Sequence, residues 1–470
     1  MEFMNRLLPV ILLSLGGCAS PFDVSRFDDD PRRGTNLVLV SDTSPGVDPA
    51  PDSNDVLIPS EAGPDDYVRI ALDRNPSIRA ANRRVDRLQQ RIAQARSLDD
   101  PVFRAAPVGE MAETAAGEVV LMTSLSQKLP FPGKLAARER IAVRNVAVAA
   151  RECDAVRLGV IADTRRAFWS LYYTTRGIEV IEVDRRLLGQ FRSIAESKYK
   201  AGAATQQDVL RASVELSNLD NELVTLRQRR TTAAAMLNRL LNRPVNAPLP
   251  EPGRVDIADV ALRLDDLLAA AARDNPEIER IRERIDGYRE RLALARLQRW
   301  PDVTLNVAYS AVDDDGLATT ANGRDQWYAG FGVNLPVWFE KLDAAENEAR
   351  QGILEGVAAL ADRRNDIAFR VQDALARVET QHRLATLFRD VIVPQARQTV
   401  QVSESSYRAG REDFLTVVDN WRKLLDFELM YHQSVAQLER HFAELQRVVG
   451  RDLDRQGSSR RADEDKETGS

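Results

Sequence analysis

Hydrophobic residues recur with two different periods along this chain. In long stretches they stand three or four positions apart or at whole helical turns, as in the series Ile70, Ala81, Val85, Leu88 and Ile92. In shorter stretches they alternate with polar residues, as in the series Val303, Leu305, Val307 and Tyr309. The first period predicts amphipathic helices and the second predicts strands with two unlike faces. The long stretches dominate, so we expect a mainly α fold with a small β part.

The predicted elements follow the same order twice. Each copy has a helix, two strands, a very long helix and a shorter returning helix. Repeat 1, residues 64–245, has its elements at 64–98, 102–108, 118–129, 134–200 and 206–241. Repeat 2, residues 262–451, has them at 262–299, 303–312, 326–335, 341–408 and 412–449, and residues 246–261 link the two repeats. At ~1.5 Å per residue, each long helix is roughly 100 Å in length.

Short motifs support the duplication. They recur in the same order and 200 to 208 residues apart: Asn75-Pro76 and Asn275-Pro276, Asp100-Pro101 and Trp300-Pro301, Leu129-Pro130 and Leu335-Pro336, Tyr199–Gly202 and Tyr407–Gly410, Leu240–Pro244 and Val448–Asp452. One such pair means little, but five collinear pairs indicate an internal repeat.

The long helices carry the signs of helix-on-helix packing. Apolar residues recur at seven-residue steps, for example at Val180, Leu187 and Ile194, which favours coiled-coil contacts. Pro394 is expected to kink the second long helix. We expect the two shorter helices of each repeat to stack end to end beside the long one. The strands then lie at one end of the helices and the Tyr-x-x-Gly turns at the other.

The two predicted strands of repeat 2 have the alternation and the length of transmembrane barrel strands, which are about 10 residues long. The pattern in repeat 1 is weaker, because residues 102–108 carry Arg104 and alternate poorly. Four strands cannot close a barrel, and lipid does not tolerate open strand edges. Other copies of the chain must therefore complete the sheet.

The N-terminus has the layout of an export signal. An apolar run from Leu7 to Leu15 follows Arg6 and is too short for a membrane-spanning helix. It ends in Leu15-Gly-Gly-Cys18, which resembles the bacterial lipobox. We expect residues 1–17 to be a signal peptide and Cys18 to carry lipid; an ordinary signal peptide with an incidental cysteine is the alternative. Residues 18–63 read as a tether and residues 452–470 as a disordered tail.

Composition and motifs limit the classes of function that the chain could have. The net charge is −6 over 470 residues, which makes a nucleic-acid partner unexpected. The second cysteine, Cys153, lies in a helical stretch and is expected to be a small core residue. The histidines His382, His432 and His441 have no metal-ligand spacing, and no catalytic motif or phosphate loop is present. We therefore expect no enzymatic activity, no metal site and no cofactor beyond the lipid.

The layout, together with Leu129-Pro-Phe-Pro-Gly-Lys134 and the two Tyr-x-x-Gly turns, resembles the TolC family of outer-membrane channels. The resemblance covers residues 64–451. The Pro-Phe-Pro-Gly-Lys sequence is similar to that of the CzcC-like and CusC-like cation-efflux branch. The resemblance implies a homotrimer with a twelve-stranded outer-membrane β-barrel continued by an α-helical periplasmic barrel. It also implies two partners, a periplasmic adaptor protein and an inner-membrane efflux pump.

By the same resemblance, the turns at Tyr199–Gly202 and Tyr407–Gly410 form the periplasmic tip that meets the adaptor. Acidic residues after these turns are the candidates for a periplasmic gate, with Asp419 at the position that lines the family's constriction: Asp208, Glu412, Asp413 and Asp419. Thr416 stands where some members have a second acidic residue, which weakens the case for a double ring. The alternative is that these residues are solvated charges at helix starts.

Two other functions fit parts of the pattern. A periplasmic adaptor lipoprotein also has long helical hairpins, but it has one hairpin between split β-rich domains. A structural coiled-coil lipoprotein needs no alternating strands, which this chain has at Val303–Ser310 and Trp327–Leu335. The sequence does not identify the exported substrate, because a passive duct does not have to recognise it.

Overall fold

The structure is a computed structural model, and it describes residues 58–109, 116–253, 257, 261–314, 316–317, 319–320 and 322–453. The expected signal peptide and Cys18 lie outside these residues. Within them, no helix combines the length and the apolar character needed to cross a bilayer.

Repeat 1 contains the elements α1 (Pro64–Arg74), α2 (Pro76–Arg96), β1 (Val102–Pro107), β2 (Val119–Leu129), α3 (Lys134–Lys200) and α4 (Gln206–Leu240). The expectation of one helix over 64–98 was wrong, because Asn75 interrupts it with extended backbone at ψ 124°. A residue before proline avoids the helical region, and Pro76 follows here. The Asn75 side chain then caps α2 by accepting a hydrogen bond from the Ser77 N–H.

Repeat 2 contains the elements α5 (Leu264–Asp274), α6 (Pro276–Leu297), β3 (Val303–Val312), β4 (Gln326–Val333), α7 (Phe339–Leu387), η3 (Phe388–Ile392), α8 (Val393–Arg408) and α9 (Phe414–Val449). The expected long helix over 341–408 is therefore interrupted by a π-helical turn, η3. Pro394 lacks an N–H and its ring clashes with the carbonyl four residues earlier, at Asp390. The expected kink thus takes the form of a local widening of the helix.

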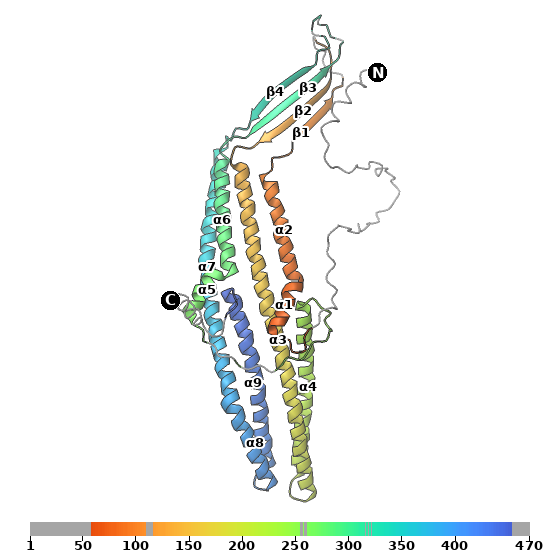
Figure 1. The fold of residues 1–470 in the computed structure, drawn as a ribbon, viewed down its shortest axis with the longest axis vertical. Helices are drawn as coiled ribbons and strands as arrows, with labels where there is room; N and C mark the ends of the chain where they lie inside the picture. Colours follow the sequence, from red (N-terminus) through yellow and green to blue (C-terminus); the bar gives the residue numbers. More distant parts are fainter. Residues whose placement is uncertain are drawn as a thin grey trace, which may run out of the picture. The chain divides into compact units, whose positions relative to one another are not determined.

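The long helix α3 lies at the centre of the helical packing. It contacts α1, α2 and α4 of its own repeat and α6 and α9 of the other. Figure 1 shows α2 and α4 beside opposite halves of α3, as expected for short helices stacked along a long one. Three buried clusters hold these helices together, and the largest side chains in them include Phe168, Trp421 and Leu445.

The two ends of the helical region are more ordered than the sequence indicated. Ile58 and Ala62, assigned to the tether, pack on the cluster around Phe168. Leu453, assigned to the tail, packs on the cluster around Leu445, and Asp452 accepts a hydrogen bond from Gln446. Both ends carry an apolar residue that reaches a neighbouring core, so residues 58–63 and 452–453 belong to the folded part and not to the tether or the tail.

The four strands form one antiparallel sheet in the order β1-β2-β3-β4. The strand β1 is one residue shorter than expected, β2 starts one residue later and β4 ends two residues earlier. The strands β1 and β4 are the edges, and neither has a partner on its outer side within the described sheet. A sheet of this kind leaves two rows of backbone N–H and C=O groups for another chain.

The register gives this sheet one apolar and one polar face. Cross-strand partners place on one face the residues Phe103, Leu125, Val307, Leu305, Phe331, Tyr309 and Trp327. The opposite face carries Arg104, Ser124, Asn306, Ser310, Tyr328, Gly330 and Gly332. On the apolar face, Phe331 is 76% exposed and Trp327 is 75% exposed. This alternation is typical of strands between lipid and a polar lumen.

Candidate functional site at the hairpin tips

The two helical hairpins end in the same backbone turn. At the first, the Gly202 N–H donates to the Tyr199 carbonyl and the Ala203 N–H donates to the Lys198 carbonyl, at 3.0 and 2.8 Å. The second turn repeats these bonds at Gly410 and Arg411. Both glycines have left-handed backbone, with φ of 70° and 71°. This is the Schellman motif, and it explains the glycine in each Tyr-x-x-Gly sequence.

The two tyrosines of these turns have different surroundings. Tyr199 is 48% exposed, whereas Tyr407 is only 6% exposed and packs on Phe414 with ring centroids 5.3 Å apart. The ammonium of Lys198 lies 4.1 Å from the centroid of the Tyr407 ring and donates to the Tyr407 carbonyl. The tip of the first hairpin therefore contacts the tip of the second through a cation–π interaction.

The four candidate gate residues take different positions at the starts of α4 and α9. Asp208 belongs to a capping box, and its carboxylate accepts a hydrogen bond from the Thr205 N–H at 3.2 Å. This geometry gives Asp208 the helix-start role that the sequence left as the alternative. Glu412 and Asp413 are exposed at the second turn, and Asp413 is the residue immediately before α9. Asp419 lies further along α9 and is half exposed.

Asp419 is next to an ion pair that joins the two hairpins. The Arg422 guanidinium on α9 lies 3.6 Å from the Asp419 carboxylate. It also donates to both carboxylate oxygens of Glu215 on α4, with Nε 3.1 Å from Oε2. Glu215 is buried. Arg422 stands three residues after Asp419 in the sequence, but the sequence gave no sign of Glu215, which lies in the other repeat.

A second buried link lies further from the tips. The Trp421 indole N–H on α9 donates to the carboxylate of Asp184 on α3 at 2.8 Å. Burial raises the pKa of Asp184 to about 6; the charge of Glu428 adds to this rise, and the Trp421 hydrogen bond opposes it. Together with Lys198–Tyr407 and Glu215–Arg422, this pair makes three connections between the hairpins of the two repeats.

The Leu129–Lys134 motif has a structural role at the opposite end of α3. Lys134 is buried, and its ammonium donates to the Trp300 carbonyl at 2.7 Å and to the Asp302 carboxylate at 2.6 Å. Asp302 also accepts from the Phe131 N–H, and the Phe131 ring stacks on Trp300. The motif therefore fastens the end of β2 to the start of β3. The sequence singled out this motif but gave no sign of its partner, Asp302.

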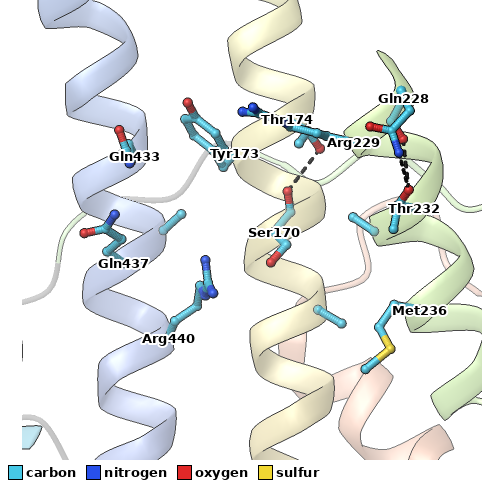
Figure 2. A pocket seen from close by; sticks show the side chains of 13 residues that line it. Ser170, Tyr173, Thr174, Gln228, Arg229, Thr232, Met236, Gln433, Gln437 and Arg440 are labelled. Carbon is cyan, nitrogen blue, oxygen red and sulfur yellow. Dashed lines mark hydrogen bonds between the residues drawn. The ribbon is translucent and has the colours of Figure 1, made fainter. Parts of the chain in front are cut away.

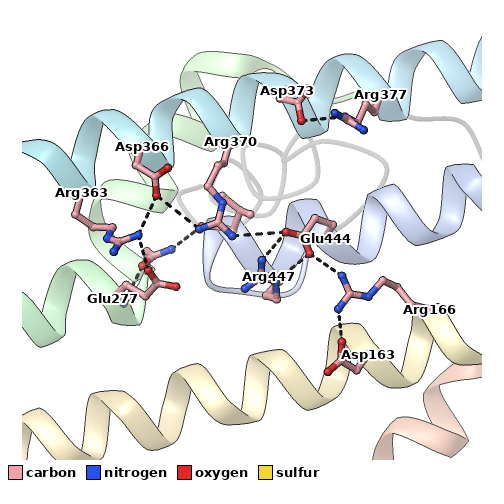
Figure 3. A network of polar contacts seen from close by, with 12 residues as sticks. Asp163, Arg166, Glu277, Arg363, Asp366, Arg370, Asp373, Arg377, Glu444 and Arg447 are labelled. Atoms are coloured by element: carbon pink, nitrogen blue, oxygen red, sulfur yellow. Dashed lines mark hydrogen bonds and ion pairs between the residues drawn. The ribbon is translucent and has the colours of Figure 1, made fainter. Parts of the chain in front are cut away.

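A network of charges lies at mid-length between α3, α6, α7 and α9 (Figure 3). Its centre is Glu444, which forms ion pairs with Arg166, Arg370 and Arg447. Burial raises the pKa of Glu444, but the hydrogen bonds from Arg447 and the charges of Arg166 and Arg370 outweigh it, so the pKa lies below its ordinary value. The network ties the repeats together at this level.

The described residues contain no group of three or more His, Cys, Asp or Glu side chains suited to hold a metal ion. Cys153 is buried on α3, as expected for a core residue, and its thiol donates to the Asn82 side chain at 3.1 Å. The polar groups at the tips are arranged as helix caps and inter-hairpin links.

Comparison with known proteins gives the chain a family context. The profile of the outer membrane efflux protein family matches residues 67–243 and 267–451, which fall within the two repeats. The cobalt-zinc-cadmium resistance protein CzcC of Cupriavidus metallidurans is 22% identical over 81% of this chain and 88% of its own length. Nodulation protein T of Rhizobium leguminosarum bv. trifolii is also 22% identical, over 82% and 84%.

Solved structures share the fold. The outer membrane protein VceC from Vibrio cholerae superposes with a TM-score of 0.68 at 19% identity, over 83% of this chain and 97% of that one. CusC superposes with a TM-score of 0.69 at 16% identity, over 83% and 93%.

Proposed function

Because the chain belongs to the outer membrane efflux protein family, we propose that it is the outer-membrane channel of a tripartite efflux system. Three copies form a passive exit duct in the outer membrane, and the helices extend into the periplasm. There they meet a periplasmic adaptor and an inner-membrane pump. The observation that carries this function is the sheet with an exposed apolar face, a polar face and two open edges.

The alternative of a periplasmic adaptor, or of a coiled-coil lipoprotein without a pore, does not account for this sheet. An exposed face with Trp327, Phe331 and Leu305 is costly in water. In lipid the same face is stabilised, and the open edges β1 and β4 pair with those of neighbouring copies. Conductance of the purified protein in planar bilayers tests the channel. A protein that inserts but gives no current contradicts the proposal.

For the anchor, we propose that Cys18 is acylated after removal of residues 1–17. The support is the sequence Leu15-Gly-Gly-Cys18 behind a short apolar run. Mass spectrometry of the N-terminal peptide of the mature protein decides this. A mature chain that starts elsewhere, or an unmodified Cys18, contradicts it.

For the gate, we propose that Asp419, Glu412 and Asp413 of three copies narrow the periplasmic end, and that the tips contact the adaptor through Tyr199, Gly202, Tyr407 and Gly410. The half-exposed position of Asp419 beside Arg422 supports its part in this proposal. Asp208 was grouped with these residues on sequence grounds, and its capping contact to Thr205 favours a role in starting α4.

For the substrate, we propose metal cations, since CzcC is a cobalt-zinc-cadmium resistance protein and aligns over most of this chain. Relatives at similar identity include a pyoverdine exporter and a toluene efflux protein, so an organic substrate is the competing proposal. Deletion of the gene should lower the tolerance of the host to cobalt, zinc or cadmium. Unchanged metal tolerance with lower tolerance to organic compounds would favour the second proposal.

A further inference from the structure

A pocket of about 410 Å³ lies between α3, α4 and α9 (Figure 2). Pockets that hold one small molecule measure roughly 300–1,000 Å³. Its polar lining includes Ser170 and Thr174 on α3, Arg229 and Thr232 on α4, and Gln437 and Arg440 on α9. The pocket is formed within one chain, at a distance along the sequence from the tip residues described above.

The pocket lies on the side of α3 that faces away from α1. On the α1 side, Phe168 packs on Tyr67 with ring centroids 5.4 Å apart. Ser170 lies two positions further along the helix, which turns its side chain through about 200° to the opposite side. Ser170 and Thr174, one turn apart, form the α3 wall of the pocket. Its inner wall, formed by Ala167, Ala233 and Ala436, belongs to the buried cluster that also contains Tyr67 and Phe168.

Two arginines enter the pocket without a carboxylate partner. Figure 2 shows Arg229 on α4 and Arg440 on α9, one from each flanking helix. Among the described residues, neither guanidinium forms an ion pair or a hydrogen bond, although their neighbours Arg227 and Arg447 both do. Burial and the nearby charge of Arg166 lower the pKa of Arg440.

The carboxylate one helical turn beyond Arg440 on α9 already has other partners. Glu444 lies one helical turn beyond Arg440, where an ion pair is geometrically possible. Its oxygens instead bond Arg166, Arg370 and Arg447. Figure 3 shows Glu444 with these three arginines around it. Within the described part of the chain, the positive charge in the pocket therefore has no carboxylate partner.

We propose that this pocket binds a small organic anion, a molecule in which a carboxylate, sulfonate or phosphate group is attached to an apolar body. The guanidinium groups of Arg229 and Arg440 pair with the anionic group, since their planar forks match its oxygens. The apolar body lies against Ala233, Met236 and Ala436, which line the same pocket. The site lies within a single chain, so the test of ligand binding does not depend on the channel function.

Calorimetric titration of the full-length protein in a neutral detergent tests the site, with 1-naphthalenesulfonate as the probe. Removing one charge-assisted hydrogen bond costs roughly 10- to 100-fold in affinity. Arg229→Gln and Arg440→Gln should each weaken binding by about 10-fold or more. The matched control is Arg377→Gln on α7, whose guanidinium is paired with Asp373 outside the pocket. The affinity of this control should stay within about twofold of wild type.

Two further probes separate the parts of the proposed ligand. Neutral 1-naphthalenesulfonamide and inorganic phosphate should each bind about 10-fold more weakly than the sulfonate, since one lacks the charge and the other lacks the apolar body. Equal binding of the sulfonate by wild type and by either single pocket variant would overturn the site. Equal binding of the sulfonamide would overturn the role of charge, and equal binding of phosphate would overturn the organic ligand.

Discussion

At the scale of single residues, the two hairpins are joined by buried polar groups whose partners lie in distant segments. Asp184 and Trp421 are 237 residues apart, and Glu215 and Arg422 are 207 apart. No local pattern in the sequence identifies such pairs, because only the packing of α9 against α3 and α4 brings them together. The aspartates at the tips were found from their position after a turn, and Asp208 then proved to be a cap.

Asp184→Asn should raise the stability of the helical region at neutral pH. The folded-state pKa of about 6 lies above the ordinary value of 3.8, so the folded protein binds the extra proton more tightly than the unfolded chain. This contribution is fully present below pH 4 and is lost as the pH rises towards 6. A shift of two units corresponds to about 3 kcal/mol. The Asn side chain still accepts the Trp421 hydrogen bond without charge.

Thermal unfolding of wild type and Asp184→Asn between pH 4 and 8 checks this. The variant should be the more stable form at pH 8, and the difference should shrink towards pH 4. Asp220→Asn is the control, since Asp220 is an exposed partner of Arg185 and should show no such trend. A constant difference at all pH values would mean that Asp184 does not titrate in this range.

The tyrosines of the two tip turns differ in burial, although the sequence motif around them is the same. The motif Tyr-x-x-Gly predicts both turns correctly, since the glycine requirement is local. It does not distinguish exposed Tyr199 from buried Tyr407, which is covered by Phe414 of its own hairpin and by Lys198 of the other. Sequence symmetry therefore does not mean equal roles at the tips.

At the scale of elements, the sequence predicted the types and most boundaries because helical and alternating periods are local. It failed where a proline interrupts a helix without ending its apolar pattern, at Asn75 and Asn275. There the structure shows one arrangement used twice. The Asn75 amide donates to the Leu240 carbonyl at 2.9 Å, and the Asn275 amide donates to the Val448 carbonyl at 2.6 Å. Each asparagine fastens a helix start to the end of the returning helix.

Asn275→Asp should destabilise the protein by about 1–3 kcal/mol. The carboxylate still accepts the cap bonds of α6, but it loses the donor to Val448 and places a charge at a site only 3% exposed. The defect should be larger at pH 8 than at pH 4, where the acid can be protonated and donate again. Urea unfolding at the two pH values measures it.

The same substitution at Asn347 is the control for Asn275→Asp. Asn347 is exposed on α7 and accepts from Arg350, which an aspartate also allows. We expect a change within about 0.5 kcal/mol for Asn347→Asp. If the two variants were equally stable, the bond to Val448 would contribute nothing.

The sheet provides a second test at this scale, since adjacent residues of β3 point to opposite faces. Val307→Lys places a charge on the apolar face, which costs about 2–4 kcal/mol in mid-membrane. Asn306→Lys places the same charge on the polar face at nearly the same depth. The first variant should reduce the amount of assembled protein in outer-membrane fractions, and the second should not. Equal assembly of both variants would mean that the assignment of the two faces is wrong.

At the scale of the whole molecule, the duplication and the position of the sheet followed from the order of elements. The closure of the sheet did not, because one chain supplies four strands and leaves the β1 and β4 edges open. The number of copies came from the family resemblance. The gate residues were also inferred from the family resemblance. Only an assembled channel brings three Asp419 side chains together.

Asp419→Ala should lower the cation selectivity of the channel and raise its conductance. A ring of carboxylates at a constriction favours cations, and removing it also widens the passage. The Arg422–Glu215 pair remains in the variant, so assembly should be unaffected. Single-channel reversal potentials in a salt gradient measure the change, with exposed Asp220→Asn as control. Identical reversal potential and conductance in wild type and Asp419→Ala would place the gate elsewhere.

The central claim is that three copies of this chain share one barrel in the membrane. The most direct measurement is the mass of the protein part of the conducting, detergent-solubilised particle by light scattering. The account predicts three chains per particle, because paired β1 and β4 edges leave no open strand in lipid. A particle of one chain that conducts in planar bilayers would contradict it.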